Sequence, residues 1–476
     1  MVRRLIWSDY ATINLYNSAM TLQLWTRRSW ALGVAALLTA SIGLTSARSA
    51  FAQRASDQDH WVPTWGTAQQ LIRVVPTQGR GAPPAQPPAT PQPASAQPGV
   101  STPPTTPPPA GPAGLQTVNN QTIRMIVRTS IGGKRARVKL SHAFGTTAVT
   151  VGAAHLAKRG DGSAIVPDSD RPLTFGGKPS FTIAPGSVVM SDPVMLDITP
   201  LTDLAVSLYL PGETGPPTTH SAALRTTYIS AEGDFTGQPE IRDGRTTTSY
   251  YWLTSIEVAA PADAAAVVTF GDSITDGARS TPDTNNTWPA LLATRLAANK
   301  ATANISVVNE GIGGNRVMTD ANGLAGVNAL ARLDRDVFSQ PGVKWLMVLE
   351  GINDIGALAQ PNAAFRVTSA DLIWAYQQII TRAHAHGIRV IGCTLTPYGG
   401  AGYYTEEGEA IRQAVNQWIR TSKAFDAVVD FEAATRDAAN AQRFRPEFDP
   451  GDHLHPNDAG YKAMANAIDL AIFKAR

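Results

Sequence analysis

The sequence is poor in cysteine and in charge. Cys393 is the single cysteine among 476 residues, which excludes an internal disulfide framework and a four-cysteine zinc site. Lys and Arg number 40 against 38 Asp and Glu, so the formal net charge is only +2. So small a charge argues against a surface that follows nucleic acid phosphates. Hydrophobic residues make up 43% of the chain, which predicts that most of it folds.

One long apolar run stands near the beginning, at residues 30–44. Arg27 and Arg28 precede this run and Ala50-Phe51-Ala52 follows it, a pattern typical of a cleavable signal peptide over residues 1–52. The run is short for a membrane span, so an uncleaved anchor is the lesser alternative. The arginine pair is also similar to a twin-arginine export signal. We therefore expect a periplasmic or extracellular protein with no stable membrane anchor and, after loss of five arginines and one aspartate, a charge of about −2.

Proline is concentrated in one segment. Between Pro76 and Pro112 lie 14 of the 34 prolines, among Gly, Ala, Gln, Ser and Thr. This composition buries too little apolar surface to offset its ordering entropy, so residues 76–112 are predicted to be a disordered insert.

Both sides of the insert show β patterns. Apolar residues alternate at Ile123, Met125 and Val127, and again from Leu204 to Leu210, with glycine-containing turn signals between such runs. Residues 53–260 are therefore predicted to be an all-β, sandwich-like domain whose two parts pair across the insert.

From residue 261 to 476 short apolar strands alternate with helical patterns. The strands are expected at residues 267–270, 305–309, 345–349, 389–394 and 428–431, and one helix is expected to start with a capping box of Thr368 and Asp371. This alternation predicts a parallel, doubly wound α/β sheet with its ligand site at the carboxyl ends of the strands. Cys393 lies in one of these strands and is interpreted as a buried core thiol.

Four polar loops follow these strands or precede the last helix. Ser273 stands between glycines in Gly271-Asp272-Ser273, the second loop is Gly311-Ile312-Gly313-Gly314-Asn315, and the third carries Asn353 and Asp354. The fourth, residues 449–457, contains His453 and His455, whereas the other six histidines lie in the β region or end a helix. A histidine that is half neutral near pH 7 and is oriented by a carboxylate suits a general base. We therefore expect Asp452 to hold His455 against Ser273; the alternative is a metal site of His453, His455, Asp449 and Asp452.

The four loops together resemble the SGNH hydrolase family, the GDSL esterases and lipases, over about residues 262–476. The resemblance implies a flavodoxin-like sheet of the SGNH type, a catalytic triad of Ser273, His455 and Asp452, and no metal or other cofactor. It also implies an oxyanion hole formed by the amides of Ser273 and Gly314 and the side chain of Asn353. Asp354 is expected to hold its loop in shape, and Arg316 to be structural rather than substrate-binding.

The implied activity is hydrolysis of carboxylic esters by acyl transfer to serine. The polar loop 278–288 and the lack of an apolar lid beside Ser273 favour short acyl groups, such as acetyl on a polysaccharide. A lipolytic or aryl esterase acting on medium acyl chains is the alternative, and a catalytically idle glycan-binding protein is the alternative from another class. The β region is expected either to hold the polysaccharide or only to support the catalytic half.

Overall fold

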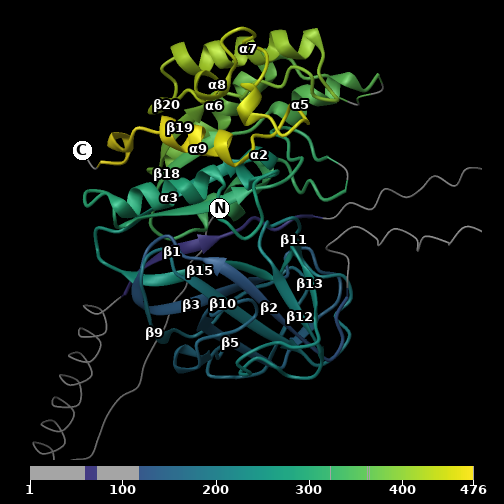
Figure 1. The fold of residues 1–476 in the computed structure, drawn as a ribbon, viewed down its shortest axis with the longest axis vertical. Coiled ribbons are helices and arrows are strands. Elements are labelled where there is room, and N and C mark those ends of the chain that lie inside the picture. Colours follow the sequence, from purple (N-terminus) through teal and green to yellow (C-terminus); the bar gives the residue numbers. More distant parts are fainter. Residues whose placement is uncertain (1–58, 72–116, 322, 362, 364, 475–476) are drawn as a thin grey trace, which may run out of the picture. The chain divides into compact units, whose positions relative to one another are not determined.

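The structure, a computed structural model, describes residues 59–71 and 117–474 apart from 322, 362 and 364 (Figure 1). The predicted signal peptide and the proline-rich insert lie outside the described residues. No helix within the described ranges is long and apolar enough to cross a membrane.

Residues 60–71 and 117–260, the β region, form antiparallel sheets. One sheet has the strand order β1-β15-β3-β8, with β9 also paired to β3, and the other has the order β13-β12-β2-β10-β5-β6. The two-stranded sheets β11-β14 and β4-β7 complete the region. The strands are β1 (His60–Gly66), β2 (Gln121–Arg128), β3 (Gly133–Ser141), β4 (Val149–Val151), β5 (Ala153–Lys158), β6 (Arg171–Pro172), β7 (Phe181–Ile183), β8 (Val188–Met190), β9 (Val194–Ile198), β10 (Asp203–Leu210), β11 (Thr219–His220), β12 (Thr227–Glu232), β13 (Arg245–Thr247), β14 (Tyr250–Tyr251) and β15 (Leu253–Ala260).

The two larger sheets enclose one apolar core, which confirms the sandwich-like fold. Val138 and Ile256 from the first sheet and Ile123 and Val206 from the second belong to the same buried cluster. The pairing across the insert is also confirmed, because β1 pairs antiparallel with β15 from His60–Ala260 to Gly66–Ser255.

Strand β2 is buried on both of its faces, although apolar and polar residues alternate in part of its sequence. Arg124 is fully buried, and its guanidinium donates to Ser207 Oγ and to the carbonyl oxygens of Ser163 and Gln238. Loops around residues 163 and 235–241 supply these acceptors and cover the face that carries Arg124, which no local pattern in β2 encodes.

After the β region the chain forms a parallel sheet in the order β17-β16-β18-β19-β20. Taken in chain order this is 2-1-3-4-5, the flavodoxin-like arrangement, so the predicted fold class is confirmed. The strands are β16 (Ala265–Gly271), β17 (Ile305–Gly311), β18 (Val343–Leu349), β19 (Arg389–Cys393) and β20 (Ala427–Val429). All five expected strands are present, but the last ends before Phe431. The side chain of Asp430 accepts from the amide of Ala433 and caps a helix that begins at Phe431.

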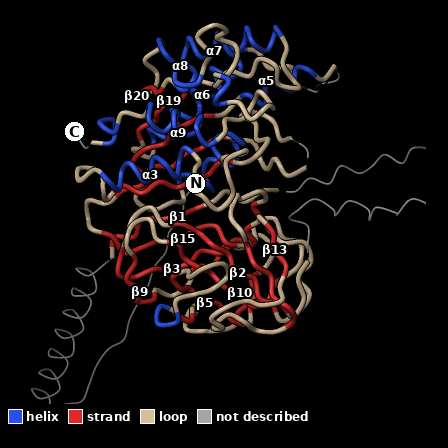
Figure 2. Tube along the Cα trace, in the orientation of Figure 1, coloured by secondary structure: helices blue, strands red, loops and turns tan. Residues whose placement is uncertain are grey.

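Helices flank this sheet, whereas the β region is built almost wholly of strands and loops (Figure 2). The helices are α2 (Ser273–Asp276), α3 (Trp288–Ala298), α4 (Ala329–Leu333), α5 (Ile352–Gly356), α6 (Ser369–Ala385), α7 (Glu406–Thr421), α8 (Phe431–Thr435) and α9 (Asp458–Ala467). The capping box of Thr368 and Asp371 opens α6 as predicted. Helix α3 packs against α9, and α6 against α7.

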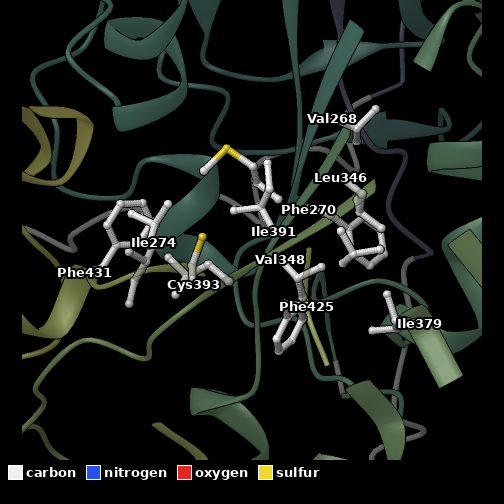
Figure 3. Packing of buried hydrophobic residues seen from close by; sticks show 14 of the residues in the cluster. Val268, Phe270, Ile274, Leu346, Val348, Ile379, Ile391, Cys393, Phe425 and Phe431 are labelled. Carbon is white, nitrogen blue, oxygen red and sulfur yellow. The ribbon is translucent and has the colours of Figure 1, made fainter. Parts of the chain in front are cut away.

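The core of the α/β region is continuous from the sheet into its helices. Val268 and Phe270 of β16, Leu346 and Val348 of β18 and Ile379 of α6 lie in one buried cluster (Figure 3). Cys393 is buried in the same cluster and carries a free thiol, as expected, and burial raises the pKa of that thiol far above its usual range. The sheet therefore gives a rigid base for the loops at its carboxyl edge.

Candidate active site

Ser273 lies where β16 turns into α2. The turn is tight because Gly271 has no side chain: a Cβ there would lie 2.1 Å from the carbonyl oxygen of Leu349 in β18. The Asp272 side chain accepts a hydrogen bond from the amide of Ile274 at 2.9 Å and caps α2. Ser273 thus occupies the first position of the helix.

The loop before α9 brings His455 to this serine. Ser273 Oγ lies 2.8 Å from His455 Nε2, and His455 Nδ1 lies 3.0 Å from Asp452 Oδ2. Because an ionised carboxylate only accepts hydrogen bonds, Nδ1 carries the proton and Nε2 is left to accept from the serine hydroxyl. The three side chains that the sequence pointed to therefore form one hydrogen-bonded relay.

Asp452 is held as a carboxylate. Although partial burial opposes ionisation, hydrogen bonds from the amides of His455 and Leu454, from the His455 ring and from Arg279 keep the pKa of Asp452 well below its usual range. The negative charge is therefore present throughout the range in which a histidine titrates.

Two further loops approach Ser273 from neighbouring strand ends. Gly314 follows β17 and has φ +76°, a conformation that glycine adopts without strain. No hydrogen bond within the described residues engages the backbone amides of Ser273 or Gly314. Both donors are therefore available to an oxyanion.

Asn353, in α5 after β18, is fixed by two contacts. Its Nδ2 donates to the carbonyl oxygen of Asn315 at 2.9 Å, and the Tyr403 hydroxyl donates to its Oδ1 at 3.4 Å. One of the two Nδ2 hydrogens is left for another acceptor. Asp354 accepts from the amides of Val317 and Met318 and so ties α5 to the second loop, as expected for a residue that shapes its loop.

The two histidines of the last loop serve different carboxylates. His453 Nδ1 lies 2.5 Å from Asp449 Oδ2, whereas His455 pairs with Asp452. No group of three or more His, Cys, Asp or Glu side chains suited to a metal converges anywhere in the described part of the chain. The four side chains of the metal alternative thus form two separate hydrogen-bonded His–Asp pairs.

A cavity of about 840 Å³ opens beside the candidate oxyanion donors. Gly314, Asn353 and Tyr403 line it, together with Arg316, Thr319, Asp320, Ala321, Ala325, Gly356, Ala357, Ala359, Gln360, Ala363, Phe365 and Gly402. No leucine, isoleucine, valine or methionine is among these described lining residues. The lining combines small residues, polar side chains and two aromatic rings.

A comparison with protein families identifies this part of the chain. Residues 269–463 match the GDSL-like Lipase/Acylhydrolase family, and the match includes Ser273, Asp452 and His455. This segment is a GDSL-like lipase/acylhydrolase domain. The protein is accordingly a carboxylic ester hydrolase.

Solved structures that match part of the chain include GDSL proteins and esterases. A protein from Desulfitobacterium hafniense described as lipolytic and of the G-D-S-L family is 23% identical, with 44% of this chain and 99% of that chain covered and a TM-score of 0.32. An acetyl xylan esterase from Geobacillus stearothermophilus is 22% identical, with 44% and 96% covered and a TM-score of 0.35. No curated protein matches the chain.

Beneath the site of the GDSL-like domain lies a buried acidic cluster of Asp272, Glu350 and Asp354. Burial is the main cause that raises the pKa of Asp272 to about 7 and that of Asp354 to about 6, and it also raises the pKa of Glu350 well above its usual value. Arg332 faces this cluster and donates to the carbonyl oxygen of Gly271 and to Asn315 Oδ1, so it joins the serine loop to the second loop.

The sequence analysis missed two partners of this site. Arg279 Nε lies 2.8 Å from Asp452 Oδ2, and its place in a polar loop just after α2 was the only available signal. His220, from the β region, lies 3.1 Å from Asp276 at the end of α2. Nothing in the local sequence around His220 marks it as a partner of the serine helix, α2, which begins at Ser273.

Proposed function

We propose that this protein is an exported serine esterase in which Ser273, His455 and Asp452 form the catalytic triad. The observation that carries the proposal is the relay from Ser273 Oγ through the His455 ring to Asp452, with contacts of 2.8 and 3.0 Å. A catalytically idle binding protein has no need of such a relay. The β region, in this proposal, supports the serine helix through His220.

In the proposed reaction the Ser273 oxygen attacks the ester carbonyl while His455 Nε2 takes its proton. The oxyanion then accepts hydrogen bonds from the amides of Ser273 and Gly314 and from Asn353 Nδ2, which lie on three separate loops. Protonated His455, stabilised by Asp452, gives its proton to the leaving alcohol. Water then attacks the acyl-enzyme by the same route and releases the acid.

The proposed substrate is a short acyl ester on a polar alcohol, such as an acetyl group on a polysaccharide. The cavity beside Asn353 supports this choice, because its described lining residues offer hydrogen-bonding groups, two aromatic rings and small alanines, without the larger aliphatic side chains that would bury a long chain. A medium fatty acyl chain would gain little apolar burial there.

Hydrolysis by the purified protein and its Ser273→Ala variant tests the proposal. We expect Ser273→Ala to abolish turnover of 4-nitrophenyl acetate, whereas Ser280→Ala, a change of a buried serine just beyond α2, should leave most activity. Equal rates for Ser273→Ala and wild type would refute the nucleophile.

Substrate preference needs a separate comparison. We expect faster turnover of 4-nitrophenyl acetate than of the decanoate, and acetate release from acetylated xylan. The opposite chain-length preference would favour the lipolytic alternative. Export is tested by expressing the full chain with Arg27 and Arg28 both changed to Lys, which should trap the precursor if the twin-arginine route is used.

A further inference from the structure

Arg316 is an arginine without a partner. Its guanidinium makes no hydrogen bond or ion pair with any residue that the structure describes, and its Nε is buried from solvent. The three fully buried arginines behave differently, since Arg124, Arg332 and Arg412 each donate to several acceptors. The expectation that Arg316 serves the framework therefore finds no hydrogen bond or ion pair to support it within the described residues, although the charge of Arg316 acts to lower the pKa of the nearby Asp354.

The backbone on both sides of Arg316 is firmly held. Asn315 Nδ2 donates to the carbonyl oxygens of Ala325 and Val327, and the amide of Val317 donates to Asp354. The carbonyl oxygen of Arg316 itself accepts from the amide of Ala329. A free side chain on a fixed backbone is pre-organised to meet a ligand, because little backbone entropy is lost on binding.

The side chain lines the cavity that begins at the candidate oxyanion donors. Arg316 shares this lining with Gly314 and Asn353 and stands two residues after Gly314. Asp320 also lines the cavity, and its Oδ1 accepts from the backbone amide and the side chain of Asn328. The guanidinium of Arg316 forms no ion pair within the described residues, so its donors face whatever occupies the cavity.

We propose that Arg316 binds a carboxylate carried by the ester substrate. A guanidinium offers a planar fork of donors that matches a carboxylate in two parallel hydrogen bonds, and Thr319 and Gln360 add polar groups in the same cavity. The inference rests on the proposed function. It narrows the substrate class to acidic esters, with the carboxylate either on the alcohol, as in an acetylated uronic acid, or on the acyl group, as in a dicarboxylic monoester.

Two pairs of substrates test the proposal, and the members of each pair differ in the carboxylate. The first pair carries the carboxylate on the alcohol and the second carries it on the acyl group, so the two positions are distinguished. The first pair is acetylated methyl glucuronoside against acetylated methyl glucoside, followed by acetate release. The second is monomethyl glutarate against methyl pentanoate, followed by methanol release. We expect wild type to prefer the acidic member of one pair.

The variants are Arg316→Gln, Arg316→Lys and the control Arg242→Gln, which removes an exposed arginine of the β region. Arg316→Gln should lower kcat/KM for the preferred acidic ester by about tenfold to a hundredfold, mainly through KM, because a charge-assisted contact is lost. Arg316→Lys should retain part of the preference. Arg316→Gln should lower kcat/KM for the neutral ester much less than for the acidic ester, and Arg242→Gln should change kcat/KM for neither ester more than about twofold.

Three results would overturn the proposal. Wild type could show no preference in either pair, the preference could survive Arg316→Gln, or Arg316→Gln could slow acidic and neutral esters equally while lowering Tm, which is the result of a framework role. A binding measurement tests the role of Arg316 separately from the proposed esterase activity, because it needs no hydrolysis. Calorimetry of glucuronate and glutarate with Ser273→Ala should detect one of these anions, and the additional change Arg316→Gln should remove that binding.

Discussion

His220 of the β region donates to Asp276 of the serine helix across a buried contact of 3.1 Å. The other ring nitrogen of His220 faces the carbonyl oxygen of Ala68 at 2.7 Å. Because both partners are acceptors, both nitrogens carry protons and the ring is an imidazolium. Burial opposes this charge, but the Asp276 carboxylate and the hydrogen bond to the Ala68 carbonyl together outweigh burial and raise the pKa of His220 above its usual value. The contact fixes the end of the four-residue helix that begins at Ser273.

The first prediction concerns this contact. We expect His220→Asn to destabilise the protein by about 1.5–3 kcal/mol and to lower kcat by about tenfold or more, because the serine helix loses its support. The matched control is His155→Asn, since His155 forms a similar pair with Asp170 at 2.8 Å within the β region. Chemical denaturation and ester hydrolysis measure both effects, and equal losses of activity in the two variants would contradict the special role of His220.

The pH dependence of the same pair has a definite sign. A histidine whose pKa is higher in the folded state contributes stability below its unfolded value, and loses it as pH rises through the folded value. The stability that Asp276→Asn removes should therefore be larger at pH 6 than at pH 9. Denaturation midpoints of wild type and variant at the two pH values measure this difference, and a loss independent of pH would show that the ring is neutral.

A second prediction concerns the donor Asn353. Asn353→Ala should lower kcat by about 10²–10³ while the fold is retained, because one of the three proposed donors to the oxyanion is removed. Asn304→Ala is the control, since the Asn304 side chain donates only to the exposed side chain of Asp263 among the described residues. Initial rates and far-UV circular dichroism distinguish loss of catalysis from loss of structure; an unchanged kcat would remove Asn353 from the oxyanion hole.

A third prediction separates the two contacts of Asp452. Asp452→Asn should lower kcat by about 10⁴, because the His455 ring loses the carboxylate that selects its tautomer. Arg279→Gln should lower kcat less than tenfold, since 60% of the Arg279 side chain is exposed and its ion pair is screened by water. Rates of both variants measured from pH 5 to 9 test this prediction. A larger loss of kcat in Arg279→Gln than in Asp452→Asn would contradict it.

A fourth prediction uses the buried carboxyl of Asp272. A carboxyl with a raised pKa destabilises the folded state as pH rises from its ordinary value toward its folded value, because only the unfolded state ionises freely in that window. For Asp272 the folded pKa is about 7. Stability of Asp272→Asn relative to wild type should therefore increase between pH 4 and 7, by up to about 1.4 kcal/mol for each pH unit, and then level off. Urea denaturation at four pH values would reveal the slope, and a flat difference would show that Asp272 is ionised in the fold.

The sequence allowed the sheet and the loops of the GDSL-like domain to be predicted because both have local signals. Each strand is a short apolar run, and Ser273, Gly314 and Asn353 follow such runs directly. Parallel strands bring their carboxyl ends to one edge, so residues far apart in sequence were expected to meet.

The contacts of His220, Arg279 and Arg316 could not be predicted in this way. The first depends on how the β region packs against α2, and the second on the course of an exposed loop. The state of Arg316 depends on which groups come within hydrogen-bonding distance of its guanidinium in space, and among the described residues none does. None of these properties leaves a periodic pattern or a motif in the chain.

The pairing of β1 with β15 also has a consequence for the synthesis of the protein. Ala260 lies 200 residues after its partner His60. At about 5–20 residues per second, β1 waits about 10–40 seconds for the strand that completes it. During that interval the apolar side chains of Trp61, Val62 and Trp65 have no β15 to cover them and can pair with another chain. We therefore expect the nascent chain to depend on chaperones most strongly before residue 260 has emerged from the ribosome.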